Sequence, residues 1–121
     1  MAAVMALNLE PFRWNWATCT AGDTYPAENW LESDSDNTTT LTRVRIKIKD
    51  SAGTVFSTLD SDTSGITINV ATAGAWDWTI DALTAPTTAG IYTFDMETTD
   101  SAGVVFTEAT GQWEILTQQT D

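Results

Sequence analysis

The chain has 121 residues with 17 acidic and 5 basic side chains, no histidine and one cysteine, and its formal net charge is -12 at pH 7. This acidic balance argues against nucleic-acid binding, which needs lysine and arginine clustered along a groove. With Cys19 alone and no histidine, an intrachain disulfide, a structural zinc site and the commonest general base are excluded. The hydrophobic fraction of 42% predicts one domain with one core.

The first seven residues are apolar, but the N-terminus has no basic residue and no cleavage pattern. They predict an N-terminal arm, residues 1–10, that packs on an adjacent subunit rather than a secretion signal. A single β-sandwich domain is expected over residues 11–121. Threonine is abundant, and because this β-branched residue suits a pleated surface, the composition predicts an all-β protein.

Residues 9–20 predict a first strand with Phe12, Trp14 and Trp16 on one face. Residues 25–32 leave two structures open, a helical turn or a second strand. A polar, acidic loop is expected to follow.

The most informative segment is residues 40–49, where charged and β-branched side chains alternate. Successive side chains of a strand point to opposite faces, so three aliphatic residues are expected in the core and four cations outside it. A positive stripe on an acidic body suggests docking against an acidic surface, such as a second copy. The plainer alternative is a solvated face whose edge is protected by lysine. The core residues are Val44, Ile46 and Ile48, and the cations, called here the cationic ladder, are Arg43, Arg45, Lys47 and Lys49.

Further short strands follow, with turns about every eight to twelve residues, which is typical of a β-sandwich or barrel. Gly111 is expected to mark a bulge, and Val70 is expected to point inward. Residues 83–89 are expected to form a connection with room for one helical turn. The expected strands cover residues 55–59, 66–70, 76–80, 91–98, 104–108 and 112–116.

A seven-residue stretch from Asp50 to Phe56 is echoed 50 positions later, from Asp100 to Phe106, and both copies predict a hairpin turn. At the same offset of 50 residues, Arg45 corresponds to Asp95 and Lys47 corresponds to Glu97. One molecule therefore offers a positive and a negative strand face. If these faces meet between neighbouring copies, they form a heterologous contact that builds a ring or a stack.

Six tryptophans are unusual in a chain of this length, and four of them form two pairs spaced i, i+2. Three roles are open for these pairs: filling the core, forming a contact with another protein, or forming a platform on which sugar rings stack. The pairs are Trp14 with Trp16 and Trp76 with Trp78.

No constellation of catalytic residues is visible in the sequence. The loop from Asp60 to Gly65 resembles the opening of a calcium loop, but Ala71 stands where the closing glutamate is needed, so a polar turn without metal is expected. Two carboxylates suffice for a glycosidase, but a small all-β chain leaves little room for a deep cleft beside its core. A phosphate loop and a nucleophile elbow are missing from the sequence. We therefore expect no enzyme activity, no catalytic residues and no cofactor.

Five short motifs follow one another along the chain: Gly22-Asp23-Thr24, Leu41-Thr42 before the cationic strand, Gly65-Ile66-Thr67-Ile68, Gly90-Ile91-Tyr92 and Gly111-Gln112-Trp113. In this order they resemble the small immunoglobulin-like modules of tailed-bacteriophage virions, such as the N-terminal domain of siphophage baseplate upper proteins. The likeness covers residues 20–117. The tryptophan-rich first strand and an acidic insertion at residues 28–37 depart from that pattern.

The resemblance implies an immunoglobulin-like β-sandwich of seven to nine short antiparallel strands that packs against other virion proteins. Its expected place is the virion, assembled in the host cytoplasm, as a homo-oligomeric tail, baseplate or fibre-attachment protein in a ring or fibre collar, with no nucleic acid and no membrane as partner. The predicted contact is made by the cationic ladder, with Asp95 and Glu97 as its counterpart. A carbohydrate-binding module for host-surface glycans and a capsid decoration protein are the alternatives.

Overall fold

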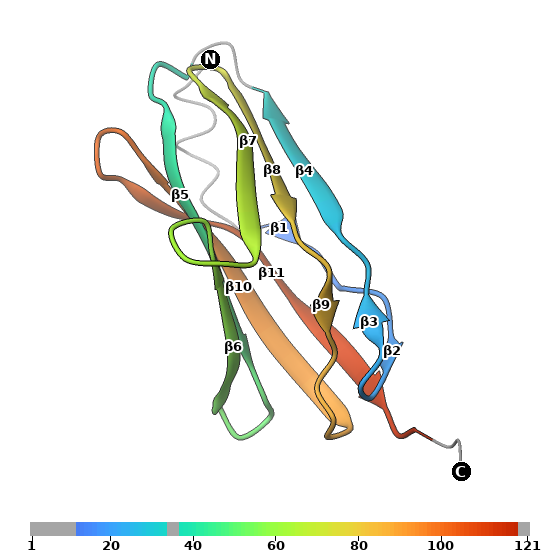
Figure 1. Ribbon diagram of the computed structural model, residues 1–121. Helices are drawn as coiled ribbons and strands as arrows, with labels where there is room; N and C mark the ends of the chain where they lie inside the picture. The colour runs from blue at the N-terminus through green and yellow to red at the C-terminus, as the bar shows by residue number, and fades with distance from the viewer. Residues whose placement is uncertain (1–11, 34–36, 119–121) are drawn as a thin grey trace.

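The computed structural model describes residues 12–33 and 37–118, and the predicted arm, residues 1–10, lies outside this part of the chain. The described residues form eleven β-strands and no helix (Figure 1). The strands are β1 (Phe12–Arg13), β2 (Cys19–Thr20), β3 (Thr24–Tyr25), β4 (Glu28–Ser33), β5 (Leu41–Lys49), β6 (Val55–Asp60), β7 (Ile66–Thr72), β8 (Ala75–Ile80), β9 (Leu83–Thr84), β10 (Gly90–Asp100) and β11 (Val105–Leu116).

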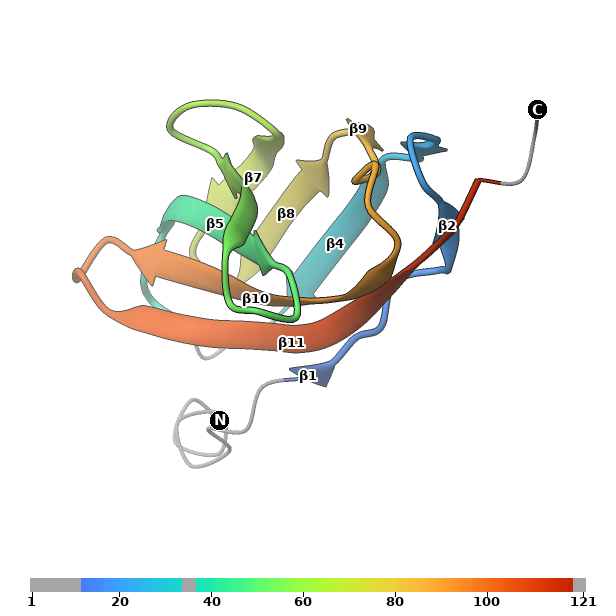
Figure 2. The ribbon, with the colours of Figure 1, turned by 90° about the horizontal axis from the view of Figure 1, so that it is seen from below.

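The strands form two facing layers (Figure 2). The larger sheet has the order β1–β11–β10–β5–β6, with β2 also paired to β11, and the opposing sheet has the order β4–β8–β7. β3 and β9 form a separate two-stranded ladder. This is the strand order of an immunoglobulin-like β-sandwich, so the predicted fold class is confirmed.

The strand number exceeds the predicted seven to nine, and two pairings are parallel. β1 and β2 both run parallel to β11, and together they replace the single strand predicted over residues 9–20. The ladder is interrupted between them because the side-chain oxygen of Asn15 accepts the backbone N–H of Gln112 at 3.0 Å. The chain still follows β11, since the backbone N–H groups of Trp14 and Trp16 donate to carbonyl groups of that strand at 2.8 and 2.9 Å.

Residues 25–32 form strands, one of the two structures left open for them, and residues 83–89 contain no helical turn, because both segments supply strands to antiparallel ladders. Two further local predictions are wrong. The bulge predicted at Gly111 lies instead at Glu108 of β11, which has no paired residue on β10 because the register shifts there. Val70 is exposed rather than inward because the register of β7 shifts just before it.

The core lies between the two sheets, and the alternation predicted for residues 40–49 is confirmed. The three predicted aliphatic residues of β5, Val44, Ile46 and Ile48, are fully buried. Tyr92, Phe94 and Met96 of β10 are at most 5% exposed. Aromatic rings fill the space beside them, with Trp16 stacked on Phe94 at 4.3 Å between ring centroids. Nearer the ends of the same strands, Leu41, Thr98 and Asp100 are buried as well.

The two echoed segments form matched hairpin turns at opposite ends of the larger sheet. In each turn the aspartate carboxylate accepts two backbone N–H bonds of 2.9 to 3.0 Å, and the glycine has a positive φ, 86° at Gly53 and 80° at Gly103. β5 and β10 are antiparallel neighbours, and Ile46 lies directly opposite Met96. A local two-fold axis through this pair therefore relates the two hairpins.

Gly111 lies where the chain between β1 and β2 crosses β11. A Cβ atom at this position would lie 1.9 Å from the carbonyl oxygen of Trp14. Glycine is therefore required by the close approach of two backbones and not by a turn conformation. This approach holds Trp14 and the buried Trp16 against the larger sheet.

We expect Gly111→Ala to lower the free energy of unfolding by about 3 kcal/mol, because the methyl group forces the first segment away from β11. Urea unfolding followed by circular dichroism measures the change. Gly22→Ala is the matched control: it has a φ of 82° but nothing within 4 Å, so it should cost only about 1 kcal/mol of backbone strain. Equal losses in the two variants would contradict the close-approach explanation.

Candidate protein interface

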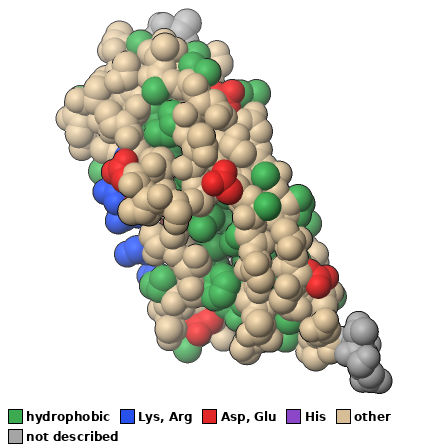
Figure 3. Space-filling view, in the orientation of Figure 1, with side chains coloured by type: hydrophobic (Ala, Val, Ile, Leu, Met, Phe, Trp, Pro, Cys, Tyr) green, Lys and Arg blue, Asp and Glu red, His purple; other side chains and the backbone are tan. Residues whose placement is uncertain are grey.

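The cationic ladder lies on the outer face of the larger sheet. Its four side chains alternate along β5 with the fully buried aliphatic residues, so they project away from the core. In the space-filling view, the basic side chains gather along one flank of the molecule (Figure 3). The strand itself is fixed on both sides, by β10 and by β6.

The two predicted acidic residues lie beside the cationic ladder in the same sheet. Glu97 of β10 is directly opposite Arg45 of β5, and Asp95 is directly opposite Lys47. The Arg45 Nη2 atom is 3.3 Å from the Glu97 Oε1 atom. The structure thus brings all six predicted interface residues onto one face, where a positive row on β5 adjoins a negative row on β10.

Arg43 has a partner that the sequence analysis did not identify. Its guanidinium donates from Nε to Asp60 Oδ1 at 3.0 Å and from Nη2 to the second carboxylate oxygen of Asp60, and Asp62 Oδ2 is 3.5 Å away. Asp60 is only 4% exposed. The hydrogen bonds from Arg43 hold the pKa of the Asp60 carboxyl below its usual range, and the same carboxylate raises the pKa of Arg43. The only sequence signal was the place of Asp60 at the end of a strand.

This ion pair predicts a pH-dependent stability. The folded pKa of Asp60 is lower than its unfolded value of about 3.9, so the pair stabilises the fold above about pH 4 and its contribution is lost as the pH falls through the lowered pKa. Asp60→Asn should therefore reduce the free energy of unfolding near about pH 7, and the difference from the wild type should shrink toward about pH 3.

Urea unfolding at several pH values measures that difference. Asp62→Asn is the control, because Asp62 is exposed and makes only the longer contact. A deficit in Asp60→Asn that stays constant over the whole pH range would contradict the assignment.

Lys47 and Lys49 are the most available cations of the ladder. Both are exposed, and in residues 12–33 and 37–118 neither makes an ion pair within 4.0 Å. The outer face therefore presents two ammonium groups that the described chain leaves unpaired.

The predicted aromatic platform is largely buried. Trp16, Trp76 and Trp78 are core residues, at most 6% exposed, and only Trp14 is partly accessible. The i, i+2 spacing places each pair on one strand face, as expected, but that face points inward because it meets the opposing sheet. Of the three roles left open by the sequence, filling the core is therefore the one that Trp16, Trp76 and Trp78 have, and they form no exposed platform.

A different aromatic group reaches the surface at the margin between the sheets. Phe12 is 61% exposed and its ring lies 5.9 Å from that of Trp30, which in turn lies 4.9 Å from Trp14. The Trp30 Nε1 atom donates to Glu32 at 3.3 Å. The sequence analysis placed Phe12 and Trp14 on one strand face, but it had no signal that β4 brings Trp30 beside them.

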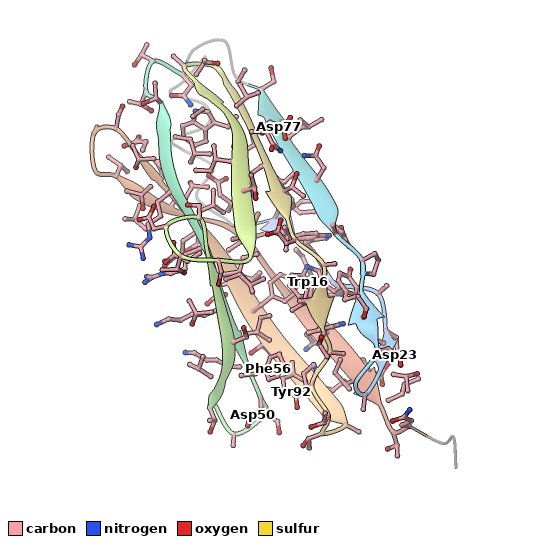
Figure 4. The ribbon with its side chains drawn as sticks, in the orientation of Figure 1. Trp16, Asp23, Asp50, Phe56, Asp77 and Tyr92 are labelled. Atoms are coloured by element: carbon pink, nitrogen blue, oxygen red, sulfur yellow. The ribbon has the colours of Figure 1, made fainter. Side chains whose placement is uncertain are left out.

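A surface hollow lined by described residues contains one carboxylate and one tyrosine, and each is engaged within the chain. This hollow of about 310 Å³ lies between the β5–β6 turn and the start of β10, where Asp50, Phe56 and Tyr92 meet (Figure 4). The Asp50 carboxylate is engaged by its own turn, and the Tyr92 hydroxyl donates to the Thr88 carbonyl at 2.8 Å. Burial, with a smaller effect from Asp50, raises the pKa of Tyr92.

Asp77 lies on the outer face of the smaller sheet, between the buried Trp76 and Trp78. Its Oδ1 atom accepts hydrogen bonds from the side-chain amides of Asn29 and Asn69, at 2.6 and 3.2 Å. In the described residues no group of three or more cysteine, aspartate and glutamate side chains is placed to hold a metal ion. The same residues include no helix able to cross a membrane.

No protein-family model and no curated protein matches this chain. Among solved structures, the chain is similar to part of a family 123 glycoside hydrolase from Clostridium perfringens, described in connection with glycolipid glycan hydrolysis. The TM-score is 0.60 with 15% sequence identity, over 95% of this chain and 25% of the hydrolase chain. The chain thus spans about a quarter of that enzyme, and at this identity the likeness shows the fold alone.

Proposed function

We propose that this protein is a non-enzymatic structural component of a bacteriophage virion, in the tail, the baseplate or a fibre attachment, and that it assembles through protein–protein contacts. The resemblance of its motifs to small virion modules suggests this role. The observation that carries the proposal is the charged outer face of the larger sheet, where the cationic ladder adjoins Asp95 and Glu97. Its partners are other virion proteins and further copies of the chain.

Two features of the sandwich support a binding role for this face. The backbone of β5 is held between two strands, so no ordering of the backbone is needed when its side chains bind a partner. Paired rows of opposite charge also favour one orientation of a partner over others, because a shifted partner meets like charges. A capsid decoration protein would use the same face, and labelling of intact particles with an antibody against the chain separates tail from capsid.

The double reversal Arg45→Glu and Lys47→Glu should leave the fold intact and abolish incorporation into particles. The cost to folding should be about 1 kcal/mol, from like charges placed directly opposite each other on β5 and β10. Circular dichroism and thermal unfolding check the fold, and quantitative mass spectrometry of purified particles measures incorporation.

The control separates position from net charge. Arg45→Gln with Lys47→Gln removes two positive charges from the face. Thr24→Glu with Thr87→Glu changes the net charge by the same amount, but it alters exposed residues outside the face. Only the glutamine double variant should reduce incorporation. Equal incorporation of both pairs, or normal incorporation of the double reversal, would count against the proposal.

The exposed aromatic group favours glycan binding as a second candidate. Phe12, Trp14 and Trp30 present partly accessible rings at one margin of the sandwich. Stacked sugar rings would change the indole fluorescence of Trp14 and Trp30. Titration of the protein with host-surface polysaccharides therefore tests this candidate: saturable quenching that disappears in Phe12→Ala with Trp30→Ala supports it, and no quenching by any of them removes it.

A further inference from the structure

The charges on the outer face form two adjacent rows, in which cations of β5 lie directly opposite anions of β10. Arg45 lies opposite Glu97 and Lys47 lies opposite Asp95, on strands about 4.8 Å apart. The local two-fold axis through the Ile46 and Met96 positions exchanges β5 with β10, and so it exchanges a cation for an anion in each case. A surface of this kind is complementary to itself in only some orientations.

We infer that two copies of the chain associate face to face through the outer face of the larger sheet. The two-fold axis that relates them runs parallel to the strands and passes between β5 and β10. This inference rests on the proposed use of the face in assembly. Rotation about that axis carries the positive row of one copy over the negative row of the other. Arg45 then lies over Glu97 of the second copy, and Lys47 lies over Asp95. Since the axis makes the interface isologous, each contact occurs twice.

The flanking positions are compatible with this arrangement. Thr58 of β6 lies directly opposite Lys47, and Thr110 of β11 lies directly opposite Asp95. The rotation therefore places Thr58 of one copy over Thr110 of the other. Lys49 is directly opposite Thr93 and falls over that neutral residue of the second copy. No acidic side chain of the two central strands is placed over another acidic side chain.

Other orientations of the same face are disfavoured by charge. A two-fold axis perpendicular to the strands would place cation over cation and anion over anion. A shift of one copy by one strand would place β10 over β10 or β5 over β5, so that like charges meet in one of the two rows. The parallel axis is the one that satisfies both rows at once, because like-charge contacts across an interface are costly.

The area of the face predicts a weak dimer. Four strands spaced about 4.8 Å and nine residues rising about 3.3 Å each give roughly 570 Å² per copy, which is below the roughly 800 Å² per partner of a standard interface. Both chains are acidic, and their mutual repulsion opposes association. At about 0.15 M salt the Debye length is about 8 Å, so distant charges are screened more than pairs in contact.

Charge-swap variants test the inference. Arg45→Glu with Lys47→Glu makes both rows negative, and Asp95→Lys with Glu97→Lys makes both rows positive. In the inferred geometry each variant alone should be monomeric at concentrations where the wild type is dimeric. An equimolar mixture should form a heterodimer, because the negative face of one variant then meets the positive face of the other. Sedimentation equilibrium at about 0.15 M salt measures the masses, and circular dichroism verifies that both variants are folded.

Asp23→Lys with Asp81→Lys is the matched control, since it changes the net charge as Asp95→Lys with Glu97→Lys does but alters exposed residues of other strands and turns. This control should still dimerise. A mixture that stays monomeric, a wild type that is monomeric, or a wild-type mass above that of a dimer would overturn the inference. If the wild type is monomeric but the negative variant is excluded from particles, the face binds a different virion protein, and the proposed function survives without the dimer.

Discussion

The antiparallel pairing of β5 with β10 is the constraint on which both the core and the charged face depend. Ile46 and Met96 lie directly opposite each other at the centre of the larger sheet, and both are fully buried. Because side chains alternate along each strand, fixing this pair inside fixes its neighbours outside. A slip of one residue in β5 would turn three aliphatic side chains into solvent and four cations into the core. The position of the charges is thus set by the burial of the uncharged residues.

The aromatic core stabilises this pairing despite an unusual cost. The indole N–H groups of Trp16, Trp76, Trp78 and Trp113 are buried and have no hydrogen-bond partner among the residues that the structure describes. Each orphaned donor costs about 1–3 kcal/mol. Burying roughly 200 Å² of indole contributes about 5 kcal/mol at 25 cal/mol per Å². The apolar gain exceeds the polar cost at each position, so a small sandwich can use tryptophan as a space-filling residue.

The sequence predicted best those features that depend on short-range pattern. The alternation in residues 40–49 specified the faces of β5, and the aspartate and glycine of each echoed segment specified its turn. Features set by pairing between distant segments were missed. The sequence around Asp60 does not predict that Arg43 is its partner. The close approach of Trp14 to Gly111 joins two segments almost 100 residues apart, so no local pattern predicts it either. The sequence indicated which charged residues lie outside the core, but their direct opposition within one sheet became visible only with the register of β5 on β10.

The parallel course of β1 and β2 along β11 has a mechanical consequence. The first described strand and the last one run side by side in the same direction, joined by backbone hydrogen bonds that include those from Trp14, Trp16 and Ala21 to β11. A force that pulls residue 12 away from residue 118 acts along these strands and loads their hydrogen bonds in shear. The bonds then share the load and must yield together rather than one after another. A subunit connected in this way resists tension between its two ends better than one whose terminal strands peel apart.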